Sequence, residues 1–330
     1  MKKLIISFCL IMVVDALIAQ SYHFSQFFST PLLTNPANTG FTEGPYRFAS
    51  NIRTQGMPGN TFFTGYLSAD ISPLRNKLTD GHKAGLGIYV MNDNSLYSAL
   101  QTNSVGISAA YNIGLDIYGQ QSFGVGIQGT YNQRRIDYGK LTFESQYGPG
   151  GYDPSLPIGE PLDVNSKHFF DVNAGIRYSV ISDENAFFAG VSVYNILSHK
   201  ENMTADEFKM PVRYTLQTGG QLNLREYGKV YMSLTAMHQA NANELTLGAA
   251  YGLQISETEK NELIGGVWYR YKDAFIPYIG YLHGNFQVGF SYDYTVSNVR
   301  TSATIKNGYE LTLLFKASDK RELKTHIPWY

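Results

Sequence analysis

The sequence is poor in cysteine, in charge and in long apolar runs, and each shortage excludes a class of protein. Its single cysteine, Cys9, lies in the first 20 residues, so we expect neither a disulfide framework nor a zinc site built on thiolates. Only 16% of the residues are charged, and the formal net charge of -1 gives no reason to expect nucleic-acid binding. After residue 19, no apolar run approaches the roughly 18 residues that a membrane-spanning helix needs.

Residues 1–19 have the layout of a secretory signal peptide. Two lysines precede an apolar run over residues 4–14, and small residues follow as far as Ala19. We predict cleavage after Ala19, which leaves Gln20 as the first mature residue. The exported chain is then either a soluble domain or a β-barrel in an outer membrane.

Aromatic residues and glycine are abundant, with 25 Tyr, 19 Phe and 32 Gly, and this mixture favours strands over helices. Within residues 286–296, each even position is apolar or aromatic and each odd position is small or polar. Most segments of this kind have about ten residues, enough to cross a bilayer when tilted. They lie near residues 45–53, 60–71, 83–92, 99–113, 121–135, 168–180, 186–196, 211–223, 228–238, 243–255, 262–271, 274–281, 285–296 and 307–316. The pattern predicts an all-β fold, a transmembrane antiparallel β-barrel of about 14 strands over residues 45–316.

The stretch FGVGIQGTY, residues 123–131, contains the spacing GxGxxG of a dinucleotide-binding loop. The same residues also alternate as a strand, and no helix start follows that could direct its N-terminus at a phosphate. We therefore interpret Gly124, Gly126 and Gly129 as small residues on the interior side of a barrel wall.

Connection lengths favour a barrel over a soluble sandwich. The longest connections, near 136–167 and 197–210, follow the fifth and seventh strands, as the outward loops of an outer-membrane barrel do. The connection at 72–83 is longer than a tight periplasmic turn should be. The strand at 274–281 contains Pro277, which cannot donate a ladder hydrogen bond.

Pairs of aromatic residues stand near several predicted strand ends, where rings suit the interfacial girdle of a membrane barrel. The alternative is packing in the core of a sandwich. The pairs are Phe62 and Phe63, Phe169 and Phe170, Phe187 and Phe188, and Trp268 and Tyr269.

No catalytic, cofactor or metal site is predicted, and we expect no enzyme. The seven histidines are scattered without metal-ligand spacing. Ser198 and His199 are adjacent in sequence, but neighbours in an extended segment point apart. The loop at 147–161 is rich in turn formers, and two interpretations stay open for it: a cell-surface contact or a flexible loop.

Several polar residues are predicted to face a polar lumen. They select a permeant, or, as we favour, pair across the interior or bind a plug segment. They are Arg47, Asn51, Arg53, Asp70, Arg177, Asp293 and Glu310.

Residues 20–44 are too apolar for a free tail, yet Pro31 and Pro36 interrupt any regular element. We expect this segment to form a plug in the lumen or to dock at its periplasmic mouth. Residues 317–330 are predicted to form a periplasmic tail, which either contacts other components or is a solvated end.

Three motifs give the chain a family resemblance: HFSQFF at 23–28, TNPANTG at 34–40 and RTQGMPGNTF at 53–62. With them, the chain resembles the PorP/SprF family of outer-membrane proteins of type IX secretion. The resemblance implies partner-binding or plug positions at these motifs, which are Phe24, Gln26, Asn35, Pro36, Ala37, Gly40, Arg53 and Gln55.

The resemblance further implies an outer-membrane protein that assists secretion or surface retention of an exported surface protein, of the gliding adhesin type. Its partners would be membrane lipid, secretion components and that exported protein, held without covalent chemistry. The alternative is a transporter of small hydrophobic substrates such as long-chain fatty acids, whose fourteen-stranded barrels also carry an N-terminal hatch with an NPA tripeptide, here Asn35, Pro36 and Ala37.

Overall fold

The structure is a computed structural model that describes most of the chain. The described residues are 24–42, 44–57, 60–73, 82–116, 120–159, 166–182, 185–197, 200–201, 208–224, 228–255, 261–296 and 307–317. The predicted signal peptide at 1–19, the Ser198 and His199 pair and the tail after residue 317 lie outside the described residues.

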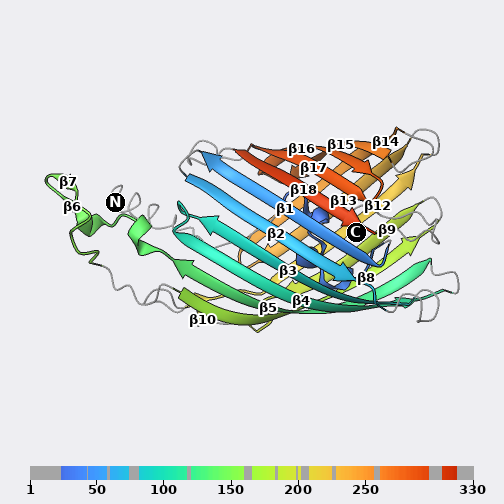
Figure 1. Ribbon diagram of the computed structural model, residues 1–330, viewed down its shortest axis with the longest axis horizontal. Coiled ribbons are helices and arrows are strands. Elements are labelled where there is room, and N and C mark those ends of the chain that lie inside the picture. The colour runs from blue at the N-terminus through green and yellow to red at the C-terminus, as the bar shows by residue number, and fades with distance from the viewer. Residues whose placement is uncertain are drawn as a thin grey trace, which may run out of the picture.

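A single ring of antiparallel strands forms the described body of the protein, a closed 14-stranded barrel (Figure 1). The last strand pairs with the first, from Arg47 opposite Lys316 to Gln55 opposite Gly308. Closure leaves no unpaired sheet edge, which is what lipid requires of a spanning sheet. The strands are β1 (Tyr46–Met57), β2 (Asn60–Ile71), β3 (Lys83–Ser95), β4 (Leu100–Gly114), β5 (Gln121–Ile136), β8 (Ser166–Ile181), β9 (Ala186–Tyr194), β12 (Arg213–Asn223), β13 (Lys229–Gln239), β14 (Ala242–Gln254), β15 (Asn261–Arg270), β16 (Ala274–His283), β17 (Phe286–Thr295) and β18 (Asn307–Lys316).

Alternation along the strands separates a greasy exterior from a polar interior, as predicted. On β17, Phe286 and Phe290 are half exposed on the outside, while the residue after Phe290, Ser291, is buried inside. The seven polar residues predicted to face the lumen are all buried there. The fold is therefore a membrane barrel and not a two-sheet sandwich, because one closed ring contains every long strand of the described residues.

Helices are short in the described residues. They are η1 (Phe27–Ser29), α2 (Pro31–Thr34), η2 (Pro36–Asn38), η3 (Tyr138–Lys140) and η4 (Glu144–Gln146). Within the part of the chain that the structure describes, no helix has the length and apolar character to cross a membrane.

The strand that contains Pro277 is present as β16, and its defect is visible on one side only. Pro277 pairs with Val267 of β15. On the β17 side the register runs from Phe275 opposite Tyr294 directly to Tyr278 opposite Ser291. The ladder skips the proline because it has no N–H to donate, and the register is kept.

The two ends of the barrel differ in their connections. We call the end where β1 begins and β18 ends the terminal end, and the opposite end the loop end. Residues 137–165 and 195–212 are the longest connections at the loop end, as predicted, whereas at the same end only two positions separate β1 from β2 and β13 from β14. At the terminal end, the connection over 72–82 is the longest.

Candidate partner-binding site and lumen plug

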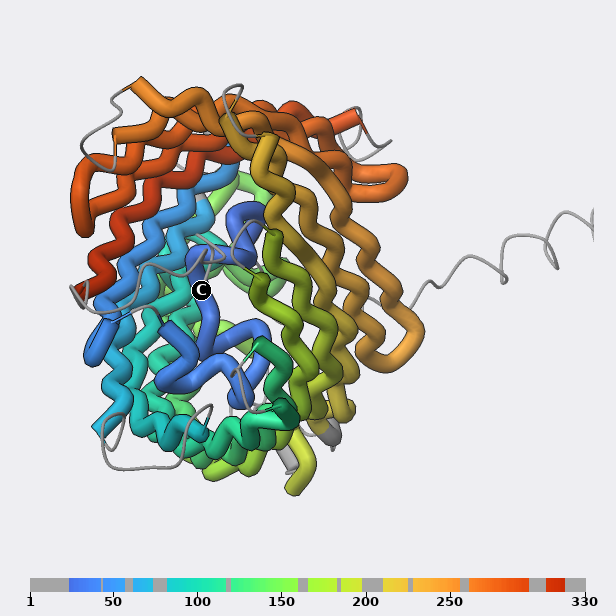
Figure 2. The backbone as a smooth tube through the Cα atoms, turned by 90° about the vertical axis from the view of Figure 1, so that its right-hand side faces the viewer, coloured from blue at the N-terminus to red at the C-terminus, as the bar shows by residue number. Residues whose placement is uncertain are grey.

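Residues 24–42 lie inside the barrel, and we call them the plug segment (Figure 2). Two prolines define their local structure, because Pro31 opens α2 and Pro36 opens η2, positions where the missing N–H costs nothing. The Asn35 side chain caps η2 by accepting a hydrogen bond from the N–H of Ala37 at 2.9 Å. Sequence thus breaks this segment into short turns that fit the lumen.

A charged cluster holds the first residues of the plug segment. Two backbone N–H groups, of Ser25 and Gln26, donate to the Glu310 carboxylate at 2.8 and 2.9 Å. The Ser25 hydroxyl donates to Asp293 at 2.6 Å and accepts from Arg53 and Arg270, also at 2.6 Å each. One hydroxyl has one proton and two lone pairs, so this geometry uses all of its capacity.

The same four charged side chains are paired with one another. Asp293 lies 2.9 Å from Arg53 and 3.0 Å from Arg270, and Arg53 is 3.6 Å from Glu310. All four are buried. Burying unpaired charge is costly, so two guanidinium groups facing two carboxylates give a stable arrangement only while all members are present.

Gln26 adds hydrogen bonds that involve three residues of neighbouring strands. Its amide donates to the Ser291 hydroxyl at 3.0 Å and to the Glu310 carbonyl at 3.2 Å. Its carbonyl accepts from the Thr312 hydroxyl at 2.8 Å. The plug segment is therefore tied to β17 and β18, the strands that close the barrel.

The far end of the plug segment is held by a second ion pair. Arg47 binds Asp70 in a bidentate manner, at 2.9 and 2.8 Å, and also donates to the Asn38 carbonyl at 3.0 Å. Asp70 accepts the N–H of Gly40 at 2.7 Å. Gly40 has a φ of +68°, a conformation that favours glycine.

Glycines in the wall let the plug segment approach the strands closely. A Cβ on Gly85 would meet the Thr39 carbonyl, one on Gly126 would meet the Pro36 and Ala37 backbone, and one on Gly175 would meet the Asn35 side chain. These positions come from β3, β5 and β8, which together with β4 form four adjacent strands of the ring. Because glycine has no side chain, the inner wall leaves room at these positions for residues 35–40.

The interpretation of all three glycines of residues 123–131 as interior residues was wrong for one of them. Gly124 and Gly126 are buried on the interior side as predicted, but Gly129 has the opposite parity and faces outward. A Cβ on Gly129 would meet nothing within 4 Å.

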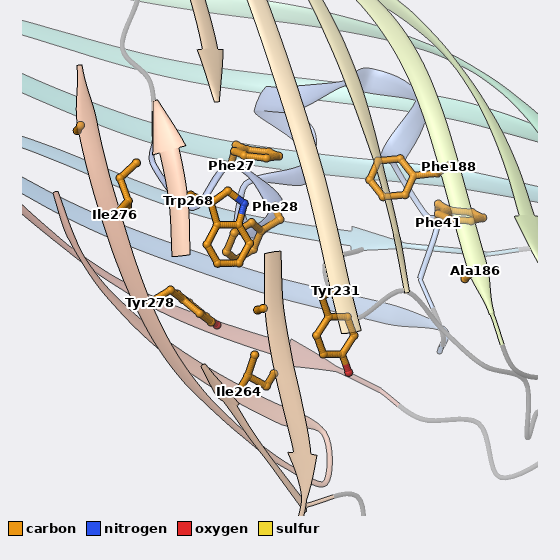
Figure 3. Packing of buried hydrophobic residues seen from close by; sticks show 12 residues of the cluster. Phe27, Phe28, Phe41, Ala186, Phe188, Tyr231, Ile264, Trp268, Ile276 and Tyr278 are labelled. Atoms are coloured by element: carbon orange, nitrogen blue, oxygen red, sulfur yellow. The ribbon is translucent and has the colours of Figure 1, made fainter. Parts of the chain in front are cut away.

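An aromatic cluster fills the space between plug segment and wall (Figure 3). The Phe28 ring lies 5.1 Å from Trp268 and 5.6 Å from Tyr278, in a tilted and an edge-to-face arrangement. The girdle interpretation was therefore wrong for Trp268 and for Phe188, which are 1% exposed and face the lumen. Adjacent residues of a strand point to opposite sides, so only one ring of each pair can reach lipid.

The eight residues predicted from the family motifs all lie at the lumen. Six belong to the plug segment and are buried, and Arg53 and Gln55 stand on the inner face of β1. Asn35 also donates to the Ile176 carbonyl of β8 at 3.0 Å, and Gln55 accepts from Arg53 at 3.2 Å. Seven of the eight are buried, and Gln55 is half buried near the loop end of β1.

Sequence reasoning missed several residues that hold the plug segment, although alternation along the strand could have identified one of them. Period two within β15 places Arg270 on the same face as Trp268, toward the lumen. The contact of Arg270 with Ser25 could not be inferred from the sequence. The other missed residues are Gly85, Gly175, Trp268 and Tyr278.

The long connection at the loop end has a defined structure of its own. Gln146 is its buried centre, where its amide donates to the Leu156 carbonyl and its backbone carbonyl accepts the N–H of Asp153. Beside it, the hairpin of β6 (Tyr147–Gly148) and β7 (Gly151–Tyr152) places the rings of Tyr147 and Tyr152 5.4 Å apart. Both rings are exposed, and the hairpin stands clear of the barrel (Figure 1). A hydrogen bond from the Ser155 hydroxyl lowers the pKa of Asp153 in this loop.

A second small hairpin, of β10 (Lys200–Glu201) and β11 (Phe208–Lys209), belongs to the connection between β9 and β12. Among the described residues, no group of three metal-ligating side chains is found. The chemistry of the described site is thus hydrogen bonding, ion pairing and aromatic packing.

Comparison with known proteins agrees with this architecture. A family model described as type IX secretion system membrane protein PorP/SprF matches residues 16–315. The toluene transporter TodX of P. putida has a similar barrel, with a TM-score of 0.51 and 10% identity over 88% of this chain and 94% of that chain. The deltaS2 mutant of the TodX monoaromatic hydrocarbon channel gives a TM-score of 0.52 and 9% identity over 87% and 93% of the two chains. A search of curated protein sequences gives no match. At these identities the likeness to TodX concerns the fold alone.

Proposed function

Because the chain belongs to the PorP/SprF family of type IX secretion system membrane proteins, we propose that it holds a specific exported protein at the outer membrane by non-covalent binding. The family and the fold are those of secretion and transport barrels and not of enzymes. The bound protein would be secreted with its help or retained on the cell surface.

The observation that supports this proposal most is the contrast between an occupied lumen and elaborated loops at one end. The plug segment contacts the wall through hydrogen bonds to charged wall residues and through aromatic packing, so part of the inner wall is already covered. In outer-membrane barrels the longer loops face outward and the short turns face the periplasm. The loop end would then face the exterior, with Tyr147 and Tyr152 as anchors, since exposed aromatics are enriched among residues that dominate protein interfaces.

Export through the signal peptide at 1–19, and a periplasmic tail at 317–330 that contacts other secretion components, remain part of this proposal. In this proposal the chain would lie beside the translocon with its loops outside. The plug residues then act on the barrel itself and not on the partner.

The test is co-purification of an exported surface protein with the full chain from the native membrane. We expect a double variant, Tyr147→Ser with Tyr152→Ser, to lose that protein while the barrel remains in the membrane. Tyr97→Ser is the matched control, because Tyr97 is another exposed tyrosine at the loop end. Unchanged co-purification in the double variant would contradict the role of the hairpin.

A second candidate function is transport of a small hydrophobic substrate, and the fold shared with a toluene transporter favours it. Uptake of a long-chain fatty acid into liposomes that contain the purified barrel separates the two functions. Uptake above that of empty liposomes supports transport. No uptake, together with a co-purified exported protein, supports the secretion role.

A further inference from the structure

One side of the barrel carries polar side chains on its outer face at the loop end, and the proposed function does not use them. The strands concerned are β3, β4, β5 and β8, which are neighbours in the ring. Within four positions of the loop end, every outward-facing side chain of these strands is polar, and most are primary amides. We call these residues the polar sector, and they are Asn92, Asn94, Gln101, Asn103, Gln133, Arg135, Ser166 and His168.

Strands on another side of the barrel end differently. Over the same four positions, the outward-facing side chains of β12, β15, β16 and β17 are apolar or aromatic. They are Tyr214, Leu216, Val267, Tyr269, Phe275, Pro277, Tyr292 and Tyr294. The polar sector is therefore a property of one side of the wall and not of the whole rim.

The strand register places an apolar row directly beside the polar sector. One row of cross-strand partners in the polar sector is Asn92, Asn103, Gln133 and His168. The next outward-facing row, one step toward the terminal end, is Val90, Val105, Tyr131 and Phe170. These four side chains are exposed, Phe170 by 69%. Apolar and aromatic residues on the outer face contact hydrocarbon and its boundary, so the polar sector lies at the level of lipid head groups.

Hydrogen bonds hold the amides of the polar sector in a fixed arrangement. The amide of Asn94 donates to Asn92 at 2.6 Å, Asn92 donates to Asn103 at 2.7 Å, and Asn103 donates to Gln133 at 3.4 Å. Ordered side chains lose little conformational entropy when a ligand binds. In these described bonds Asn103 uses one N–H and one lone pair, whereas a primary amide has two N–H groups and two lone pairs on its oxygen. Capacity for a ligand is left on both sides of the amide.

The chemistry of the polar sector narrows the class of ligand. Neutral amides both donate and accept hydrogen bonds, and sugar hydroxyls do the same. A head group recognised through phosphate alone calls for several cations, whereas Arg135 is the single Lys or Arg side chain of the polar sector. The rings of Tyr131 and Phe170, 5.0 Å apart, offer apolar surface beside the amides. His168 joins the two rows, because its Nδ1 lies 2.6 Å from the Tyr131 hydroxyl.

We propose that the polar sector binds the saccharide head group of a membrane glycolipid, whose acyl chains lie along the apolar row. A lipid fits better than a soluble glycan, because its two parts contact two adjacent rows at once. The side of the membrane rests on the proposed function, in which the loop end faces the outer leaflet, where an outer membrane carries its glycolipids. Binding itself is measurable on the purified barrel in either orientation.

The experiment is native mass spectrometry of the purified full chain with two probes, digalactosyldiacylglycerol and dioleoylphosphatidylcholine. Neither lipid has a net charge and only the first has sugar hydroxyls, so we expect the wild type to retain the galactolipid in preference. Asn103→Leu with Gln133→Leu should lower its retention about tenfold, which is about 1.4 kcal/mol, and leave that of the choline lipid unchanged. The matched control is His238→Leu with Asn243→Leu, an outward-facing pair at the loop end of β13 and β14 that is also hydrogen-bonded, at 2.7 Å.

A second variant tests the amide donors with hardly any change of volume. Asn103→Asp removes both N–H groups and should lower galactolipid retention severalfold, whereas Asn243→Asp should not. The head group without acyl chains, digalactosylglycerol, should not displace the bound galactolipid at the same concentration.

Four results would overturn the proposal. They are equal galactolipid retention by the two double variants, no preference for the galactolipid in the wild type, displacement by digalactosylglycerol, which would indicate a site for soluble glycans, and loss of a co-purified protein instead of lipid in the Asn103 and Gln133 variant. Unchanged co-purification of the exported protein in the Tyr147 and Tyr152 variant, with the galactolipid bound as expected, would contradict the proposed function alone.

Discussion

The two ends of the plug segment are held in the barrel by different kinds of interaction. At residues 25 and 26, buried charges on β1, β15, β17 and β18 surround one hydroxyl and two N–H groups. At residues 35–40, glycines of β3, β5 and β8 let backbone lie against backbone, with one ion pair at the edge. The charged end depends on which side chains are present, and the glycine-lined end depends on side chains that are absent.

This difference predicts different responses to substitution. At the charged end, removing one member leaves its partners buried with fewer opposite charges around them, although the shape of the lumen hardly changes. At the glycine-lined end, adding one carbon creates a collision, although no charge is lost. Variants of the charged end should therefore mainly lower the free energy of unfolding, and variants of the glycine-lined end should mainly shift the plug segment.

The largest effect is expected for Asp293→Ala at the charged end. It leaves Arg53 and Arg270 without their shared carboxylate, and breaking a buried ion pair in this way costs about 3–5 kcal/mol. Urea titration of the barrel in detergent measures the free energy of unfolding. Asp153→Ala, at an exposed loop carboxylate, is the control and should change that free energy far less. A loss no greater than that of the control would show that the cluster does not stabilise the fold.

Gly126→Ala at the glycine-lined end should cost less, about 1–3 kcal/mol, as overpacking does. The added carbon meets the backbone of Pro36 and Ala37, so we also expect the plug segment to shift and the ion conductance in planar bilayers to rise. Gly129→Ala on the same strand adds a carbon in open space and is the matched control. Equal conductance of the two variants would contradict the close packing.

Asn35→Ala removes both a helix cap and a hydrogen bond to the wall, and we expect a loss of about 1–2 kcal/mol. Asn35→Ser keeps an oxygen for the cap but loses the amide that donates to the Ile176 carbonyl. The serine variant should fall between the wild type and the alanine variant in urea titration. Identical losses in both variants would mean that only the bond to β8 matters.

Salt should have the smallest effect. Between about 0.1 M and 1 M the screening length falls from roughly 10 Å to 3 Å, but buried pairs are screened much less than exposed ones. We therefore expect the midpoint of unfolding of the wild type to respond to salt no more than that of Asp293→Ala. A clearly larger response of the wild type would place the cluster in contact with solvent.

Local periodicity was sufficient to predict the barrel but not what lies inside it. Residues 286–296 show period two directly, and the same rule located β16 despite Pro277. The same alternation also predicts that Gly129 faces outward. The interpretation that treated the three glycines as one group overlooked this. Fold and family were thus accessible from sequence.

The contacts of the plug segment were not accessible, because they join residues far apart in the chain. Ser25 and Asp293 are 268 positions apart, and nothing in either local sequence indicates their hydrogen bond. Likewise Trp268 is read equally well as a girdle residue or as a lumen residue until the register of its strand is known. The side of the wall that a residue faces and the residues that it contacts in the lumen depend on how all strands pair in the closed ring.

The central claim, that residues 24–42 occupy the lumen as a fixed part of the barrel, is tested most directly by ion conductance in planar bilayers. The full chain is compared with a variant that lacks these residues, after both have been shown to span the membrane. The account predicts low conductance for the full chain and a large, stable increase on deletion. Equal conductance of the two proteins would contradict it.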